Sequence, residues 1–208
     1  MEIEYREFKD QDFSQIVDVM RNTWDLSPKM RESALLETEY SLLGILANMS
    51  FSQIAFVDGR PVGLLIGTSQ NQIQQGEKEK QYLALREQKK AEIRKHRLDG
   101  IAFCHRYFTL YDKIHDKMLK KTGTSYPAEL ALFVLLQEER GKGIGRHLFE
   151  SFSEDLRQKQ VSRFYVRTDG MCNYGFYEHM GMKRIAKSFL GLPFLKSCEL
   201  YQYGKELD

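Results

Sequence analysis

The chain contains few cysteines, few prolines and no long hydrophobic run. Its three cysteines, Cys104, Cys172 and Cys198, are odd in number and far apart, which excludes a disulfide framework and a CxxC metal site. No apolar run approaches the roughly 20 residues that span a bilayer. The first ten residues lack the basic and apolar segments of a signal peptide. We therefore expect a soluble, cytoplasmic protein without a membrane segment or a metal.

An excess of charge of one sign is also missing. The 31 Lys+Arg residues against 29 Asp+Glu residues give a net charge of +2, which argues against nucleic acid as a partner bound through bulk charge. The 42% hydrophobic and 12% aromatic content excludes a disordered chain. A length of 208 residues is typical of one domain, so we predict a single domain over residues 1–208.

The first third of the chain predicts a strand, two helices and a hairpin. Apolar residues three and four apart predict one helix from Phe13 to Trp24, with Trp24 on its buried face, and a second over 32–47. Asp58-Gly59 separates two short apolar runs. An Asp-Gly pair in that position is typical of a tight hairpin turn, because glycine tolerates a positive φ.

Residues 69–125 differ from the rest in charge. They hold 13 Lys+Arg and 7 Asp+Glu, a net of +6, against −4 for the remainder. A charged helical pattern to about Arg97, followed by an apolar stripe from Ile101 to Met118, predicts an inserted helical hairpin. The basic charge indicates either a solvated helix face, which we favour, or a surface for an acidic acceptor or nucleic acid.

The last third again mixes strands and helices. The patterns predict, in chain order, a strand over 128–135, a helix over 143–159, a strand over 163–166, a short helix over 172–180 and final strands over 183–189 and 197–203.

The sharpest local feature is the run Arg140-Gly141-Lys142-Gly143-Ile144-Gly145 between a strand and a helix. Its glycines let the backbone approach an anion, which the free amides and dipole of the helix N-terminus would bind. Arg140, Lys142 and Arg146 can add charge-assisted contacts. Tight packing alone would also explain such a turn. The GxxxxGK[ST] phosphate loop is absent, and the late position does not fit a dinucleotide-binding unit.

Two motifs together resemble the GNAT superfamily of acyl-CoA-dependent N-acyltransferases. The pattern [RQ]-x-x-G-x-[GA] falls on Arg140, Gly143 and Gly145, and the pattern F-Y-x-x-x-G falls on Phe176, Tyr177 and Gly181. The order of predicted elements also agrees with this family. The resemblance implies an α/β (α+β) fold with a mixed, mostly antiparallel central sheet flanked by helices, here with a helical insertion at 69–125.

The resemblance implies that acetyl-CoA is the co-substrate, with its pyrophosphate on the loop and its pantetheine arm beside the preceding strand. The implied cofactor-binding residues are Phe133, Val134, Leu135, Arg140, Gly141, Lys142, Gly143, Ile144, Gly145, Arg146, Asn173 and Tyr177. Asn173 departs from the family pattern, because the usual asparagine stands further from the tyrosine, where this chain has Gly170.

Two residues are implied as catalytic. Tyr177 would protonate the leaving CoA thiolate, with Tyr174 as the alternative, whereas Phe176 fits the core. Glu129 resembles the base glutamate of histone-acetyltransferase members, since an amine must lose a proton before it attacks. An exposed strand carboxylate, or a salt-bridge partner of the basic insert, explains Glu129 equally well.

The implied function is transfer of an acetyl group from acetyl-CoA to a primary amine, by direct attack in a ternary complex. The acceptor, a small molecule or a protein, would lie against residues 24–30, parts of 32–47 and residues 191–197. The alternative is an acyl-CoA-binding regulatory or interaction module without transferase activity, whose basic insert binds a partner or RNA. A homodimer is left open.

Overall fold

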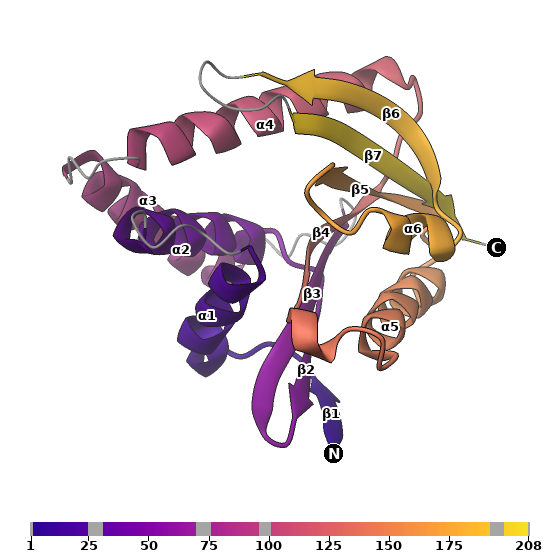
Figure 1. Ribbon diagram of the computed structural model, residues 1–208, viewed down its shortest axis with the longest axis horizontal. Helices are drawn as coiled ribbons and strands as arrows, with labels where there is room; N and C mark the ends of the chain where they lie inside the picture. The colour runs from indigo at the N-terminus through magenta and orange to yellow at the C-terminus, as the bar shows by residue number, and fades with distance from the viewer. Residues whose placement is uncertain (1, 25–30, 70–75, 96–100, 192–197, 208) are drawn as a thin grey trace.

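A seven-stranded sheet lies at the centre of the computed structural model, which describes the chain except residues 1, 25–30, 70–75, 96–100, 192–197 and 208 (Figure 1). The strands follow one another across the sheet in the order β1-β2-β3-β4-β5-β7-β6. Their bounds are β1 Ile3–Arg6, β2 Phe51–Val57, β3 Arg60–Ser69, β4 Ala128–Leu135, β5 Arg163–Asp169, β6 Lys183–Leu190 and β7 Cys198–Glu206. Only β4 and β5 are parallel, so the predicted mixed, mostly antiparallel sheet is confirmed.

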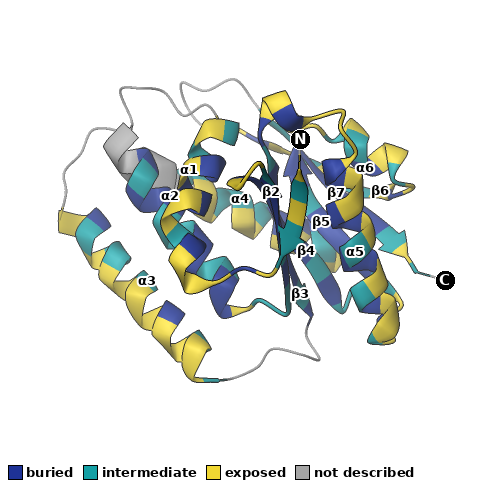
Figure 2. Ribbon diagram, turned by 90° about the horizontal axis from the view of Figure 1, so that it is seen from below, coloured by how far each residue is buried: buried dark blue, intermediate teal, exposed yellow. Residues whose placement is uncertain are grey.

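Helices cover both faces of this sheet. Their bounds are α1 Phe13–Thr23, α2 Arg31–Ala47, α3 Glu77–Lys95, α4 Ile101–Lys121, α5 Ile144–Gln158 and α6 Gly175–His179. Helices α1 and α2 lie on one side of β2 and β3, and α5 lies on the other (Figures 1 and 2). None of these helices, over the residues described, has the length and apolarity of a membrane span.

The local turn predictions are confirmed in one place and corrected in another. Asp58 and Gly59 have φ of +48° and +77° and join β2 directly to β3, as the Asp-Gly signal predicted. Trp24 was expected on the buried face of the first helix, but its side chain is 38% exposed. The reason is that α1 ends at Thr23 and Trp24 has left the helical conformation, so the periodic stripe no longer determines where its side chain lies.

The sheet divides between β4 and β5. These two strands pair only from Ala128–Leu130 to Phe164–Val166. Beyond that point β4 continues against β3 as far as Leu135, and β5 continues against β7 as far as Asp169. The two halves of the sheet therefore diverge from a short common base, and each presents a backbone edge without a strand partner to the other.

A β-bulge interrupts β4 just after that common base. Leu130 lies opposite Gly67 and Leu132 lies opposite Ile66, so that Ala131 has no partner on β3. An extra residue of this kind bends a strand and increases its twist. The bulge therefore accompanies the departure of β4 from β5.

Both predicted helices of the insert are present, and each packs on a different surface. Helix α3 lies along α2, where the Lys89 ammonium is 3.0 Å from the Glu39 carboxylate and the Arg86 guanidinium stacks 4.3 Å from the Tyr40 ring centre. Figure 2 shows that α3 is exposed along most of its length. Helix α4 instead crosses β6 and β7, and Met118 packs there with Leu190 and Leu200. His115 and Met118 of the predicted apolar stripe are buried against the sheet, whereas Phe108 is 38% exposed.

Helix α4 also buries a polar group against the sheet. His115 has no exposed surface, and its two ring nitrogens have no hydrogen-bond partner among the described residues. The side-chain amide of Gln202 on β7 donates to the His115 carbonyl at 2.8 Å. Burial, and next the positive charge of Arg167, lower the pKa of His115 from 6.5 to about 3. The imidazole is therefore neutral in the folded protein.

The buried imidazole makes stability depend on pH. Below pH 6.5 His115 is protonated in the unfolded chain, whereas in the folded chain it stays neutral until about pH 3. The free energy of unfolding therefore falls as the pH falls from 6.5 towards 3. Between pH 6.5 and 4.5 we expect the wild type to lose about 2 kcal/mol more than His115→Leu. Urea unfolding of both proteins across this range measures the difference. Equal losses in the two proteins would show that His115 is protonated in the folded state.

Candidate functional site

The glycine loop leaves open space on its outer side. After β4 the chain forms a short 3-10 turn at Gln137–Glu139, passes through residues 140–143 and begins α5 at Ile144. Gly141 and Gly143 have φ of +79° and +82°, a conformation that side chains rarely allow. No atom lies within 4 Å of where a Cβ would be placed on either residue. The backbone here can therefore be approached closely, as the motif predicted.

Gly145 has a different role in the same loop. A Cβ at this position would lie 3.4 Å from the Phe133 ring and 3.6 Å from Leu135 and Phe176. Its lack of a side chain lets the first turn of α5 pack closely against β4. Tight packing, the alternative explanation of the motif, thus applies to Gly145, while the open space at Gly141 and Gly143 favours a bound anion.

The N-terminus of α5 and the adjacent cations suit an anion. Gly143, at the N-cap, has no side chain that could accept hydrogen bonds from the amides of the first turn. The Arg140 guanidinium reaches the Leu135 carbonyl at 3.5 Å and has no carboxylate partner among the described residues. Lys142 is paired with Glu139 at 2.8 Å and Arg146 with Glu150 at 2.7 Å. To bind a phosphate group, Lys142 and Arg146 would each have to leave this carboxylate partner.

The open edge of β4 leads directly into this loop. Val134 points into the core, whereas Phe133 and Leu135 face the first turn of α5. The Phe133 ring is 5.2 Å from that of Phe176 on α6. On the side of β5, the backbone of these residues has no strand partner. The structure therefore brings the predicted strand residues and the predicted loop residues to one place.

Helix α6 places Tyr177 at the same opening. Its ring lies between those of Phe176 and Tyr203 and is 8% exposed, and its hydroxyl makes no hydrogen bond to the described residues. Burial, and then the charges of Cys172 and Asp169, raise the pKa of Tyr177. The hydroxyl is therefore protonated at neutral pH and able to donate.

The neighbours of Tyr177 sort into core and surface. Phe176 packs between Phe133 and Phe149, as a core residue should. The Tyr174 ring packs against Tyr201 at 5.1 Å. Asn173 is exposed, and its backbone carbonyl accepts from the Phe176 amide as α6 begins. Asn173 and Tyr174 thus lie at the start of the helix, whereas the Tyr177 side chain is buried.

Glu129 lies in an ion-pair network at the base of the opening. Its carboxylate accepts from Arg167 Nε at 2.6 Å and from the Tyr165 hydroxyl at 2.8 Å. Arg167 also faces Asp112 and Asp116 of α4, at 3.5 and 3.7 Å. Glu129 therefore does form a salt bridge, but its partner is Arg167 of β5 and not a basic residue of the insert, as was expected. The role of Glu129 as a base stays a prediction.

The sequence analysis did not identify Asp169, the last residue of β5. The residue is 8% exposed, and its Oδ1 accepts hydrogen bonds from the amides of Met171 and Cys172 at 2.9 and 3.1 Å. The short helix was predicted to begin at Cys172, but α6 begins at Gly175, because this turn occupies the residues before it. An aspartate before a glycine at a strand end was the only signal in the sequence.

The described residues include part of the surface expected to hold the acceptor. Residues 25–30 and 192–197, which make up most of the two predicted acceptor loops, lie outside the described residues. Helix α4, in contrast, is placed against the opening. Burial, and next the charge of Asp169, raise the pKa of both Tyr107 and Tyr111 on α4, so these hydroxyls lie near that carboxylate.

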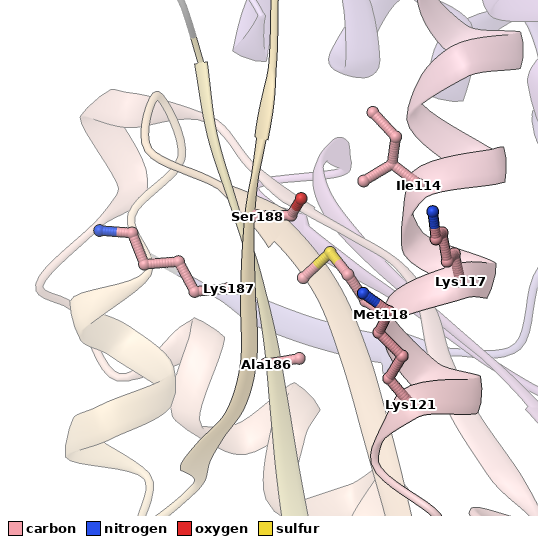
Figure 3. A pocket seen from close by; sticks show the side chains of 7 residues that line it. All are labelled: Ile114, Lys117, Met118, Lys121, Ala186, Lys187 and Ser188. Atoms are coloured by element: carbon pink, nitrogen blue, oxygen red, sulfur yellow. The ribbon is translucent and has the colours of Figure 1, made fainter.

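A cavity of about 320 Å³ lies elsewhere, between α4 and the edge strand β6 (Figure 3). Figure 3 shows Met118 between the helix and the strand, with Lys117 and Lys121 along the helix. The lining residues are Ile114, Lys117, Met118, Lys121, Ala186, Lys187 and Ser188. It contains none of the predicted site residues and is separated from β5 by β7. The candidate site is therefore the opening between β4 and β5.

Comparison with known proteins gives matches of three kinds. The family model described as "Acetyltransferase (GNAT) family" matches residues 16–182. The chain is 35% identical over 71 residues to an uncharacterized N-acetyltransferase, CT2212, of Chlorobaculum tepidum, which covers 34% of this chain and 44% of that protein. The matched segment is thus less than half of that relative.

Solved structures share the fold over nearly the whole length. PH1933 from Pyrococcus horikoshii OT3 has a TM-score of 0.61 at 17% identity and covers 100% of this chain and 99% of that one. YncA from Salmonella typhimurium, solved with acetyl-CoA, has a TM-score of 0.54 at 12% identity and covers 99% of this chain and 94% of that one. Identities this low show the fold alone.

The family match covers most of the chain, including the open strand edge, the glycine loop and the helix that carries Tyr177. The fold and the sequence motifs agree with it. The chain belongs to the acetyltransferase (GNAT) family.

Proposed function

We propose that this protein is an acetyl-CoA-dependent N-acetyltransferase that acts on a primary amine by direct attack in a ternary complex. The observation that carries the proposal is a juxtaposition. The open edge of β4 leads into the glycine loop at the start of α5, and α6, which carries Tyr177, packs on that edge through Phe176 and Phe133.

The residues present fit the donor. Backbone amides of 141–146, at a helix N-terminus with no side-chain cap, suit the pyrophosphate. Arg140 has no competing carboxylate among the described residues, and Lys142 and Arg146 lie beside the loop. The unpaired edge at Phe133, Val134 and Leu135 offers strand-like hydrogen bonds to the amides of a pantetheine arm.

Few groups of this chain would take part in the acetyl transfer itself. Acetyl-CoA supplies the acetyl group as a thioester, and a backbone amide near the end of β4 would polarise its carbonyl. Tyr177 donates a proton to the departing thiolate. Glu129 is the candidate base that takes the proton of the amine, directly or through water. The alternative is a structural role, which its hydrogen bonds with Arg167 and Tyr165 would explain.

Titration of the protein with acetyl-CoA, followed by a thiol-release assay over primary amines, tests this function. We expect saturable binding and release of CoA with at least one amine. Binding without release on any amine would favour the regulatory module that binds acyl-CoA without transferring it. Absence of binding would refute the assignment of the loop.

Gly143→Ala tests the loop. We expect acetyl-CoA affinity to fall about 10- to 100-fold, because a methyl group would enter the open space and the left-handed backbone would be strained. Gly123→Ala is the matched control, since Gly123 also has a positive φ, of +66°, and open space around it. Both variants should lose about 1–2 kcal/mol of stability. Equal acetyl-CoA affinities in calorimetry would show that the loop does not bind the donor.

Tyr177→Phe tests the proton donor. Loss of a general acid should lower kcat about 10- to 1,000-fold, with little change in acetyl-CoA affinity. Tyr174→Phe is the comparison, because it removes the hydroxyl one turn earlier. Steady-state thiol release by the two variants decides between them. Unchanged turnover in Tyr177→Phe would rule out this hydroxyl as the acid.

Glu129→Gln tests the base. If the carboxylate takes the proton, kcat/KM should fall about 100-fold or more and the low-pH limb of its profile should disappear. A purely structural carboxylate would instead lower Tm and leave the shape of the profile unchanged. Glu154→Gln, a change at an exposed carboxylate of α5, is the control for both measurements.

A further inference from the structure

We propose that Asp169 binds the ammonium group of a cationic alkylamine acceptor, in a site that helix α4 of the insert completes with Tyr107 and Tyr111. The inference rests on the proposed function and names the acceptor class of that same site. It also gives the 69–125 insert a role beside the reacting groups.

The position of Asp169 is the first argument. It lies three residues beyond Val166, the last residue of β5 that pairs with β4, so it stands on the diverging part of the strand. Its partner on β7 is Leu200. Leu200 forms a buried cluster with Met118 and Leu190, and Tyr107 and Tyr111 of α4 pack against that cluster, so α4 covers this part of the sheet.

The charge of Asp169 is the second argument. Asp169 is a buried residue, and a buried carboxylate is costly unless it is paired. Glu129, on the adjacent strand, has Arg167 as its cation, whereas Asp169 forms no ion pair with any residue that the structure describes. Backbone amides engage only its Oδ1. The Cys172 thiol also interacts with this carboxylate, but neither the amides nor the thiol supplies a positive charge, so a cation from outside the described chain would complete the pairing.

The surroundings of Asp169 favour an ammonium group. Three tyrosines from two helices, Tyr107, Tyr111 and Tyr177, lie near enough for its charge to raise the pKa of each, after the effect of burial. Their rings offer aromatic faces, which attract cations, and their protonated hydroxyls add polarity without positive charge. Because Tyr177 is the proposed proton donor, a cation held at Asp169 lies beside the reacting groups.

Unpaired polar atoms one residue pair away from Asp169 on the sheet provide a second observation. On the same face of the sheet, the next residue pair is Arg167 with Gln202. The Gln202 Oε1 and both ring nitrogens of His115 are wholly buried without a hydrogen-bond partner among the described residues. Such atoms are normally satisfied, so this layer is incomplete without a further polar group. The unpaired atoms need hydrogen-bond donors, and an alkylammonium group offers three N–H donors.

Asp169→Asn separates charge from structure. Asparagine keeps the Oδ1 that accepts from Met171 and Cys172, so the turn into α6 should be retained and Tm should change little. The probes are putrescine, spermidine and L-lysine, with aniline as an amine that is uncharged at neutral pH. Each is titrated calorimetrically into protein saturated with CoA and then assayed for thiol release with acetyl-CoA. Asp18→Asn, on the exposed side of α1, is the matched control.

For each cationic probe that the wild type accepts, we expect Asp169→Asn to weaken binding about 10- to 100-fold and to raise the KM by a similar factor. Binding and turnover of aniline, and binding of acetyl-CoA, should not change. Tyr107→Phe should retain the preference for a cation, because it keeps the ring. Equal weakening of aniline and the cationic probes would overturn the proposal, as would a wild type that binds none of the three cations. The acetyl-CoA titration of the wild type reports separately on the proposed function.

Discussion

The pairing of β4 with β5 stops at Leu130 and Val166, and the features of the candidate site follow from that separation. A strand inside a sheet has its amides and carbonyls bound on both sides, and only an unpaired edge is free for another molecule. Here β3 pairs with one side of β4 from Ala128 to Leu135, except at the bulged Ala131, while the other side is open for residues 131–135. The edge is rigid because it belongs to the core, and it is unpaired because β5 has turned away.

Charge holds the base of the division together. Arg167 on β5 binds Glu129 on β4 and faces Asp112 and Asp116 on α4, so one guanidinium joins two strands and the insert. Arginine suits this place because its planar group offers several donors in fixed directions. On α4, Asp112 and Asp116 approach this arginine while staying largely exposed, and the basic residues Lys120 and Lys121 lie in the last turn of the helix.

The sequence predicted what depends on neighbouring residues and missed what depends on distant ones. Strand β4, the helices of the insert and the turn at Gly59 follow from local periodicity and glycine chemistry, and the structure has them. The open backbone at Gly143 was likewise visible in the spacing of the loop. The approach of Tyr107 and Tyr111 to Asp169 joins segments about 60 residues apart, which no periodicity encodes. Trp24 was misplaced because a helical stripe holds only as far as the helix, and α1 ends one residue earlier.

The bulge at Ala131 has a geometrical consequence for the two sides of β4. Glu129 and Phe133 are four residues apart, and in a regular strand that even spacing would turn both side chains to the same face. In this chain Glu129 meets Arg167 on the side covered by α4, whereas Phe133 meets Gly145 and Phe176 on the side of α5 and α6. One additional residue thus reverses the alternation within a single strand. Without the bulge, the same four-residue spacing would turn the carboxylate and the aromatic ring to one face, and β4 would no longer present one of them to the side of the insert and the other to the side of the loop.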